Sequence, residues 1–275
     1  MDRKKQQVAS QFSRASSSYD SAAHIQQYSA QQLCQQLSQL SQLQGHWLDL
    51  GSGTGFAVES LIQQGAEQVT GVDLSEGMVE YSREKLARLP FEAVVGDAED
   101  LPFENHKFTG IYSNLMIQWS EQPEQLFSET KRVLKPGSLF AFATLGPRTM
   151  HELKSAWQQV DPYVHVNKFA AKESVLAEFE QHFDLIQVNQ QEYVQHHPNL
   201  NSLLKELKAI GATNVNSGRR PGLGGRERLR KLDEAYRSLS GKNKDQNPNQ
   251  TQLPLTYDLI WVIGRVKETQ SSSVQ

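Results

Sequence analysis

The chain of 275 residues contains a single cysteine, Cys34, and no long apolar run. A lone cysteine cannot close an internal disulfide, which fits a reducing compartment, and the amphipathic pattern around Cys34 favours a buried apolar role. A membrane-spanning helix would need about 18 consecutive apolar residues, and a secretory signal would need an apolar core. Neither is present, so we expect a cytoplasmic protein with no membrane partner.

The sequence also lacks a marked excess of charge and the spacing of a metal site. Its 28 lysines and arginines against 31 aspartates and glutamates give a net charge of −3, which does not favour nucleic acid as a partner. Its eight histidines do not combine with cysteines or acids at the spacing of zinc ligands. We therefore expect no metal, and we interpret the His196-His197 pair before Pro198 as a surface turn.

What the sequence does contain is a glycine-rich turn directly after an apolar run. Gly51, Gly53 and Gly55 alternate after residues 47–50, and a helical pattern follows over 57–64. Glycine is required where a backbone turns sharply or where a side chain would obstruct a ligand. A dinucleotide loop would need its third glycine one residue later, and a phosphate-binding loop would need Gly-Lys-Ser/Thr. Neither fits, which leaves another ligand or a tight turn without one.

Acidic residues follow the next two predicted strands. Asp73 closes the strand at 68–74, 22 residues after Gly51, and Asp97 follows the third strand. An acid at the end of the second strand can accept both hydroxyls of a ribose, and this spacing suits one β-α-β unit. Strands and helices alternate over 47–145, which predicts a parallel sheet with helices on both faces.

The other elements are predicted from their apolar periodicity. Helices are predicted within the first 46 residues, with one at 31–44, and at 150–160, 172–181 and 199–211; strands are predicted at 91–95, 108–113, 139–144, 183–196 and 255–266. The Leu-Lys-Pro-Gly stretch at 134–137 is expected to form a turn, because proline and glycine favour turns.

The acid-x-Gly-x-Gly-x-Gly pattern from Asp49, with Asp73 and the Asp-Ala-Glu-Asp-Leu-Pro-Phe run at 97–103, resembles the class I S-adenosylmethionine (SAM) methyltransferases. The resemblance implies an α/β, Rossmann-like fold whose seven-stranded, mostly parallel sheet carries a cap of N-terminal and inserted helices. It implies SAM as the methyl donor, with the adenine amino group near Asp97. The cofactor-binding residues that it implies are Asp49, Gly51, Gly53, Gly55, Asp73, Leu74, Met78, Asp97, Ala98, Glu99, Asn114 and Gln118.

The N-terminal segment is similar to a narrower group, the malonyl-acyl carrier protein O-methyltransferases of biotin synthesis. The pattern Phe-x-Arg-Ala-x-x-x-Tyr-Asp-x-x-Ala-x-x-Gln is matched at Phe12, Arg14, Ala15, Tyr19, Asp20, Ala23 and Gln26. Quinone-pathway methyltransferases share part of this segment. Tyr19 is the candidate that would position the acceptor, because a phenol can place a hydrogen bond at the rim of an apolar site.

A glycine- and arginine-rich stretch at 211–225 matches the same group, and we expect its Arg219 to hold the acceptor carboxylate bidentately. Six basic residues and one acid lie between Arg219 and Lys231, so this stretch is either a solvated face or a docking site for an acidic acyl carrier protein. A carboxylate acceptor is already ionised at neutral pH, so no general base is expected.

We expect one methyltransferase domain over 1–275, divided into an N-terminal helical cap segment at 1–46, a SAM-binding core at 47–145, a sixth strand with inserted cap helices at 146–252, a last strand at 253–267 and a disordered tail at 268–275. The expected activity is methylation of the free carboxylate of malonyl-acyl carrier protein or malonyl-coenzyme A. Two alternatives remain open at this point. One is a small-molecule methyltransferase of the quinone-pathway type, and the other is a SAM-binding protein without catalysis.

Overall fold

The computed structural model describes residues 3–40, 42–210, 226–240 and 252–267. Its strands are β1 (His46–Leu50), β2 (Gln68–Asp73), β3 (Phe91–Val95), β4 (Phe108–Asn114), β5 (Leu134–Leu145), β6 (Phe183–His197) and β7 (Leu253–Val266). Its helices are α1 (Arg3–Ala22), α2 (His24–Leu40), α3 (Val58–Gln63), α4 (Glu76–Lys85), α5 (Pro123–Val133), α6 (His151–Gln158), α7 (Lys172–Phe179), α8 (Leu200–Ala209) and α9 (Arg226–Ser240), with a 3-10 turn η1 (Ile117–Trp119).

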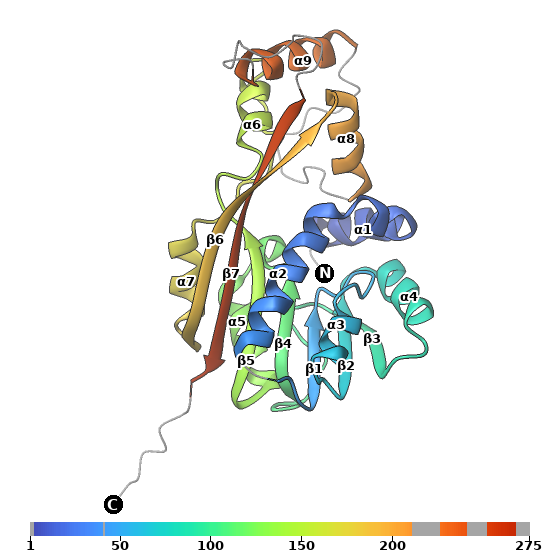
Figure 1. Cartoon of the computed structure of the whole chain (residues 1–275), viewed down its shortest axis with the longest axis vertical. Helices are drawn as coiled ribbons and strands as arrows, with labels where there is room; N and C mark the ends of the chain where they lie inside the picture. The colour runs from blue at the N-terminus through green and yellow to red at the C-terminus, as the bar shows by residue number, and fades with distance from the viewer. Residues whose placement is uncertain (1–2, 41, 211–225, 241–251, 268–275) are drawn as a thin grey trace, which may run out of the picture.

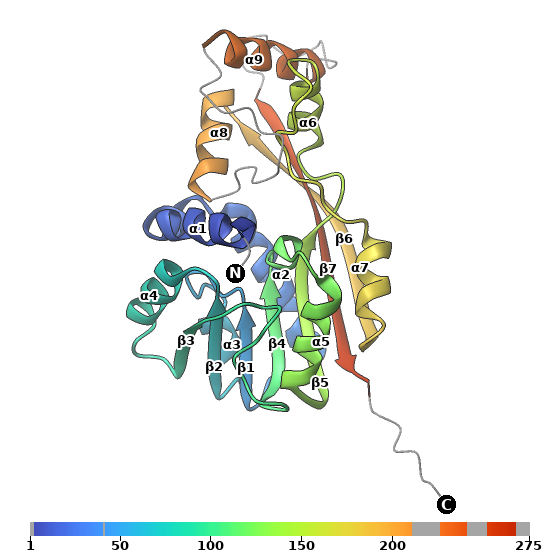
Figure 2. The same cartoon turned by 180° about the vertical axis from the view of Figure 1, so that it is seen from behind.

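The strands form one sheet in the order β3-β2-β1-β4-β5-β7-β6. The first five strands of that order pair in parallel, whereas β7 runs antiparallel to both β5 and β6. Helices α2 and α3 cover one face of the sheet, and α5 and α7 cover the other (Figures 1 and 2). The predicted seven-stranded, mostly parallel sheet is therefore confirmed.

The sheet face under α5 and α7 is held by five buried phenylalanines from four elements. Their ring centroids lie between 4.7 and 6.2 Å apart, mostly in tilted or edge-to-face contact. The five are Phe127, Phe140, Phe142, Phe179 and Phe183. Because such rings bury large apolar areas, this cluster fixes α7 and the start of β6 to the sheet.

The two long strands β6 and β7 extend beyond the rest of the sheet. They pair from Phe183↔Val266 to His197↔Leu253, whereas β5 pairs with β7 only over Leu259–Arg265. The extension carries α6, α8 and α9, which stand above α1 and the carboxyl ends of the parallel strands (Figure 1). These three helices, with α1, are called the cap below.

Three sequence-based expectations about elements were wrong. His197 does not lie in a surface turn, because it ends β6 and is buried beneath α8. The Pro136-Gly137 pair is an irregularity inside β5 rather than a turn before it, since the register shifts between Phe108↔Leu134 and Gly110↔Leu139. The helix expected at 31–44 begins at His24 and ends at Leu40.

Helix α9 was not predicted, although Leu232 and Tyr236 recur at helical spacing and are buried. None of the helices in the described ranges is long and apolar enough to cross a membrane.

Replacing Phe179 by alanine should lower the free energy of unfolding by about 3–5 kcal/mol, because it leaves a cavity among four other rings. Urea unfolding followed by circular dichroism measures this loss. Phe56→Ala is the matched control, since Phe56 is 41% exposed and its truncation should cost less than about 1 kcal/mol. Equal losses in both variants would contradict the role of the phenylalanine cluster.

Candidate active site

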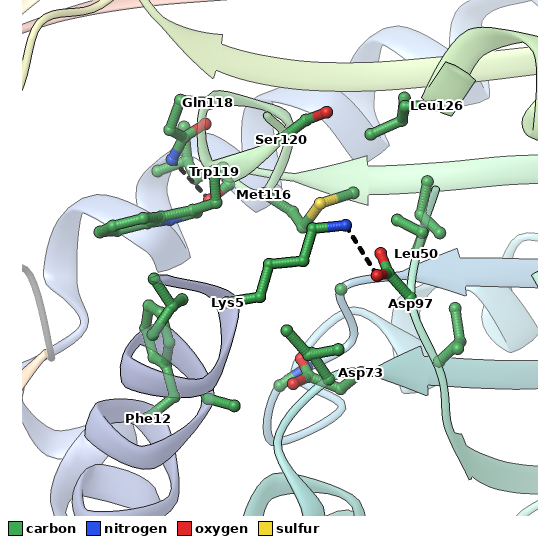
Figure 3. Close-up of a pocket in the computed structure, with 18 of the residues that line it drawn as sticks. Lys5, Phe12, Leu50, Asp73, Asp97, Met116, Gln118, Trp119, Ser120 and Leu126 are labelled. Atoms are coloured by element: carbon green, nitrogen blue, oxygen red, sulfur yellow. Dashed lines mark hydrogen bonds and ion pairs between the residues drawn. The ribbon is translucent and has the colours of Figure 1, made fainter. Parts of the chain in front are cut away.

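A large cavity, called the edge cavity here, lies at the carboxyl ends of β1, β2 and β4 under α1 (Figure 3). Such an edge is where ligands bind in open α/β sheets. Ten of the twelve predicted cofactor residues line the edge cavity: Gly51, Gly53, Asp73, Leu74, Met78, Asp97, Ala98, Glu99, Asn114 and Gln118. Their contact with a cofactor stays a prediction. Of the other two, Asp49 lines a smaller neighbouring cavity, and Gly55 packs against Leu86.

The glycine turn after β1 packs closely against the other residues that line the edge cavity. Gly51 has a φ of +73°, and a Cβ on it would lie 2.3 Å from the Cγ of Met116. Any other residue would therefore be strained and would also collide with the wall of the cavity. The backbone N–H of Gly53 donates to Oδ2 of Asp73 at 2.9 Å, so the turn and the end of β2 hold each other.

Two carboxyl groups lie near each other at the turn, Asp49 buried and Asp73 half-buried. Burial raises the pKa of Asp73, although backbone N–H groups of Ser75 and Gly53 partly oppose this. Burial and then the charge of Asp73 raise the pKa of Asp49 to about 7, and no hydrogen bond in the described part of the chain offsets either effect. Asp49 is therefore a buried acid whose ionised form needs a positive partner.

The small cavity beside Asp49, called the turn cavity here, is rich in unused hydrogen-bond acceptors. Among the described residues, Oδ1 of Asn114, Oε1 of Gln26 and Oγ of Ser52 are buried without a hydrogen-bond partner, and all three residues line this cavity. The Nδ2 of Asn114 donates to the backbone oxygen of Gln26 at 2.9 Å, which fixes the orientation of its amide. Buried acceptors without donors are costly, so the group that fits here is a cationic donor such as an ammonium.

Lys5 enters the edge cavity from α1, far in sequence from the strands. Its Nζ lies 2.7 Å from Oδ2 of Asp97 (Figure 3). The same Nζ also pairs with the carboxylate of Glu99. Burial would lower the pKa of Lys5, but these two acids outweigh it and raise the pKa. Sequence reasoning missed Lys5, because a lysine on a polar helix gives no signal of the acids that it reaches.

Glu99 joins α1 to the loop after η1. It accepts hydrogen bonds from Oγ of Ser120 and from the backbone N–H groups of Glu121 and Gln122. Burial opposes the ionisation of Glu99, but the bonds from Lys5, Ser120 and the loop outweigh it and lower its pKa to about 2. Glu99 is thus ionised and well supplied with donors, so it fastens α1 over the edge cavity.

Aromatic side chains close the other end of the edge cavity. The ring of Phe12 meets Trp119 at 5.6 Å between centroids and Tyr19 at 6.2 Å. Burial, followed by the charges of Asp73 and Asp20, raises the pKa of Tyr19, so its phenol stays protonated.

A third cavity, called the cap cavity here, lies between α2, α6, α8 and the upper end of β7. It shares six wall residues with the edge cavity: Phe12, Tyr19, Leu115, Gln118, Trp119 and Asn167. Tyr19 lines all three cavities. The three cavities therefore meet at its side chain.

The second predicted positioning residue, Arg219, lies outside the described residues. Of the predicted basic stretch, α9 contains the part from Arg226 to Lys231. Three of its basic side chains pair within the chain: Arg228 with Asp161, Arg230 with Glu234 and Lys231 with Glu227. No cluster of histidines, cysteines or acids that could hold a metal occurs among the described residues.

Residues 48–142 match the model of the methyltransferase domain family. The chain is 36% identical to a malonyl-[acyl-carrier protein] O-methyltransferase of Methylococcus capsulatus, over 86% of this chain and 87% of that protein. It is 34% identical to the protein of the same name from Yersinia pestis, over 94% of this chain and 90% of that protein. The chain belongs to the malonyl-[acyl-carrier protein] O-methyltransferase family.

Longer relatives and solved structures extend this result. The chain is 36% identical to the biotin biosynthesis bifunctional protein BioHC of Teredinibacter turnerae over 99% of its own length, but it spans only 49% of that protein. A putative methyltransferase structure from Bacillus halodurans superposes with a TM-score of 0.60 at 18% identity, covering 84% of this chain and 97% of that one. At this identity the structure supports the methyltransferase fold alone.

Asp49→Asn should stabilise the ligand-free protein, and increasingly so as pH rises. The folded pKa of about 7 lies above the unfolded value, so wild-type stability falls as pH rises from about 4 to 7. A difference of about three pKa units corresponds to about 4 kcal/mol, which the asparagine variant avoids. Urea unfolding at pH 5 and pH 8 measures the difference in unfolding free energy between the variant and wild type. Glu84→Gln is the control, because Glu84 is exposed. Parallel pH profiles for wild type and Asp49→Asn would contradict the buried charge.

Proposed function

We propose that this chain transfers the methyl group of SAM to the free carboxylate of a malonyl thioester on acyl carrier protein, forming the methyl ester that primes pimeloyl synthesis for biotin. The observation that carries the proposal is the turn cavity, whose acceptors suit the amino group of SAM, in a chain 34–36% identical to proteins named for this reaction. Its single cysteine, Cys34, suits the cytoplasm as the site of the reaction.

The described residues fit SAM at each of its polar groups. Asp49, Asn114 and Gln26 would accept hydrogen bonds from its ammonium group in the turn cavity. Asp73 is the candidate for the ribose hydroxyls and Asp97 for the adenine amino group. Leu74, Met78 and Ala98 would supply apolar wall around the adenine, Gly51 and Gly53 would admit the amino-acid end, and Gln118 would line the methyl end.

When bound, SAM supplies a methyl group that its sulfonium sulfur activates for in-line displacement. The chain needs to orient the acceptor oxygen about 3 Å from that methyl and to exclude water. Phe12, Tyr19 and Trp119 line the junction of the edge and cap cavities, where their rings would exclude water. The protonated phenol of Tyr19 would donate a hydrogen bond that positions the acceptor. No residue has to remove a proton, because the carboxylate is ionised at neutral pH.

Positive charge near the acceptor would come from two places. Arg219 remains our candidate for holding the carboxylate. Lys168 also lines the edge cavity beside Asn167 and forms no ion pair with the described part of the chain. A cation at this position would offset the cost of bringing the carboxylate out of water.

We place the acidic carrier protein on the stretch from Arg219 to Lys231. Within α9, Arg228 is half-buried and tied to Asp161, so it serves the cap itself. The pairs of Arg230 and Lys231 are exposed pairs one helical turn apart, which contribute about 0–1 kcal/mol each. These two side chains can therefore change partner when an acidic surface approaches.

SAM affinity should fall as pH drops below about 7, because protonation removes the negative charge with which Asp49 attracts the ammonium group of SAM. With a pKa of about 7, the affinity at pH 6 should be about eightfold lower than at pH 7.5. Isothermal titration calorimetry between pH 5.5 and 7.5 measures this, and it avoids the titration of the SAM amino group near pH 8. Asp49→Asn should bind SAM at least about tenfold more weakly and without this pH dependence. A wild-type affinity for SAM that does not change over this pH range would refute the role of Asp49.

Methyl-labelled SAM should transfer a base-labile, volatile label to malonyl-acyl carrier protein most efficiently. Malonyl-coenzyme A and free malonate are assayed in parallel, and heat-treated protein is the control. Transfer to a quinone precursor, with none to any malonyl species, would favour the small-molecule alternative. SAM binding without any labelled product would instead favour a protein without catalysis.

A further inference from the structure

The cap cavity has walls that suit an uncharged ligand. The described residues that line it include no lysine, arginine, aspartate or glutamate, and its apolar wall includes Ile25, Leu153, Val166 and Leu207. The one histidine among these lining residues, His165, already has a partner, because its Nε2 lies 2.7 Å from Oδ1 of Asp161. A ligand group carrying a full charge would lose its hydration here without gaining a counter-charge.

The wall of the cap cavity also contains a buried hydroxyl group, on Tyr257. Tyr257 is 1% exposed, and its hydroxyl is buried without a hydrogen-bond partner among the described residues. A buried tyrosine hydroxyl usually finds a partner. The nearby Tyr236 shows the usual case, because its hydroxyl donates to the backbone oxygen of Pro254 at 2.6 Å. The Tyr257 hydroxyl is therefore a donor available to a ligand in the cap cavity.

We infer that the cap cavity holds the uncharged thioester arm of the acceptor and that the Tyr257 hydroxyl donates a hydrogen bond to a carbonyl oxygen of this arm. This inference rests on the proposed function. The cap cavity joins the edge cavity at Tyr19, so an acyl group whose carboxylate reaches the methyl donor extends its arm into the cap cavity. Tyr257 is thus a residue that selects a thioester acceptor over a free dicarboxylate.

The test measures binding of an amide analogue of malonyl-pantetheine to the full chain saturated with S-adenosylhomocysteine, so that no turnover occurs. Tyr257→Phe should weaken the analogue about fivefold and leave the affinity for S-adenosylhomocysteine unchanged. Its melting temperature should stay equal or rise, because the variant removes a buried hydroxyl without a partner. Leu207→Trp fills the cavity and should weaken the analogue more than about twentyfold, because the arm no longer fits.

Tyr236→Phe is the matched control, since it removes a partnered hydroxyl from the same cap. It should lower the melting temperature while the analogue binds as to wild type. The inference is overturned if the analogue fails to bind wild type, or if either Tyr257→Phe or Leu207→Trp binds it normally. A wild type that binds the analogue in the cap cavity but transfers no label would overturn the proposed reaction and leave the cavity assignment standing.

Discussion

The buried carboxylate of Asp49 is the constraint on which the site depends. It is buried near the end of a central strand, close to Asp73, and no cation among the described residues offsets its charge. Ionising it in the empty protein is unfavourable, so the same group that weakens the folded state favours a cationic ligand. The acceptors of Asn114 and Gln26 suit the same kind of ligand, because they have no donor among the described residues.

The cap is held over the strand ends by contacts at both of its sides. The paired strands β6 and β7 carry α6, α8 and α9 above the strand ends, while α1 is fastened below them through Lys5 and Glu99 (Figure 1). The phenylalanine cluster anchors β6 at its other end, so the long strand pair has a rigid base. A stable core thereby positions a cap whose inner wall can differ between methyltransferases without changing the sheet.

The sequence was most informative where the residue at a position is determined by its neighbours along the chain. The glycine turn, Asp73 and the alternation of strands and helices all follow from chemistry within one β-α-β unit. The sheet confirms the alternation and puts the turn and Asp73 at the ends of β1 and β2. Contacts between distant segments gave no such signal. Lys5 reaches Asp97 across 92 residues, and the burial of His197 depends on how α8 packs. The basic charge of α9 obscured its apolar face.

Tyr19 is the residue at which the three parts of the proposed site meet. Its side chain borders the turn cavity with its hydrogen-bond acceptors, the edge cavity with its acids, and the mostly apolar cap cavity. A lysine or arginine in place of Tyr19 could pair with Asp49 or Asp73, and would then compete with the ammonium and the ribose of SAM for these acids. A phenol that burial keeps neutral can instead form a wall for all three cavities and still donate one hydrogen bond. In the proposed reaction, selectivity would then rest on the walls beyond Tyr19, which are charged in the edge cavity and neutral around Tyr257.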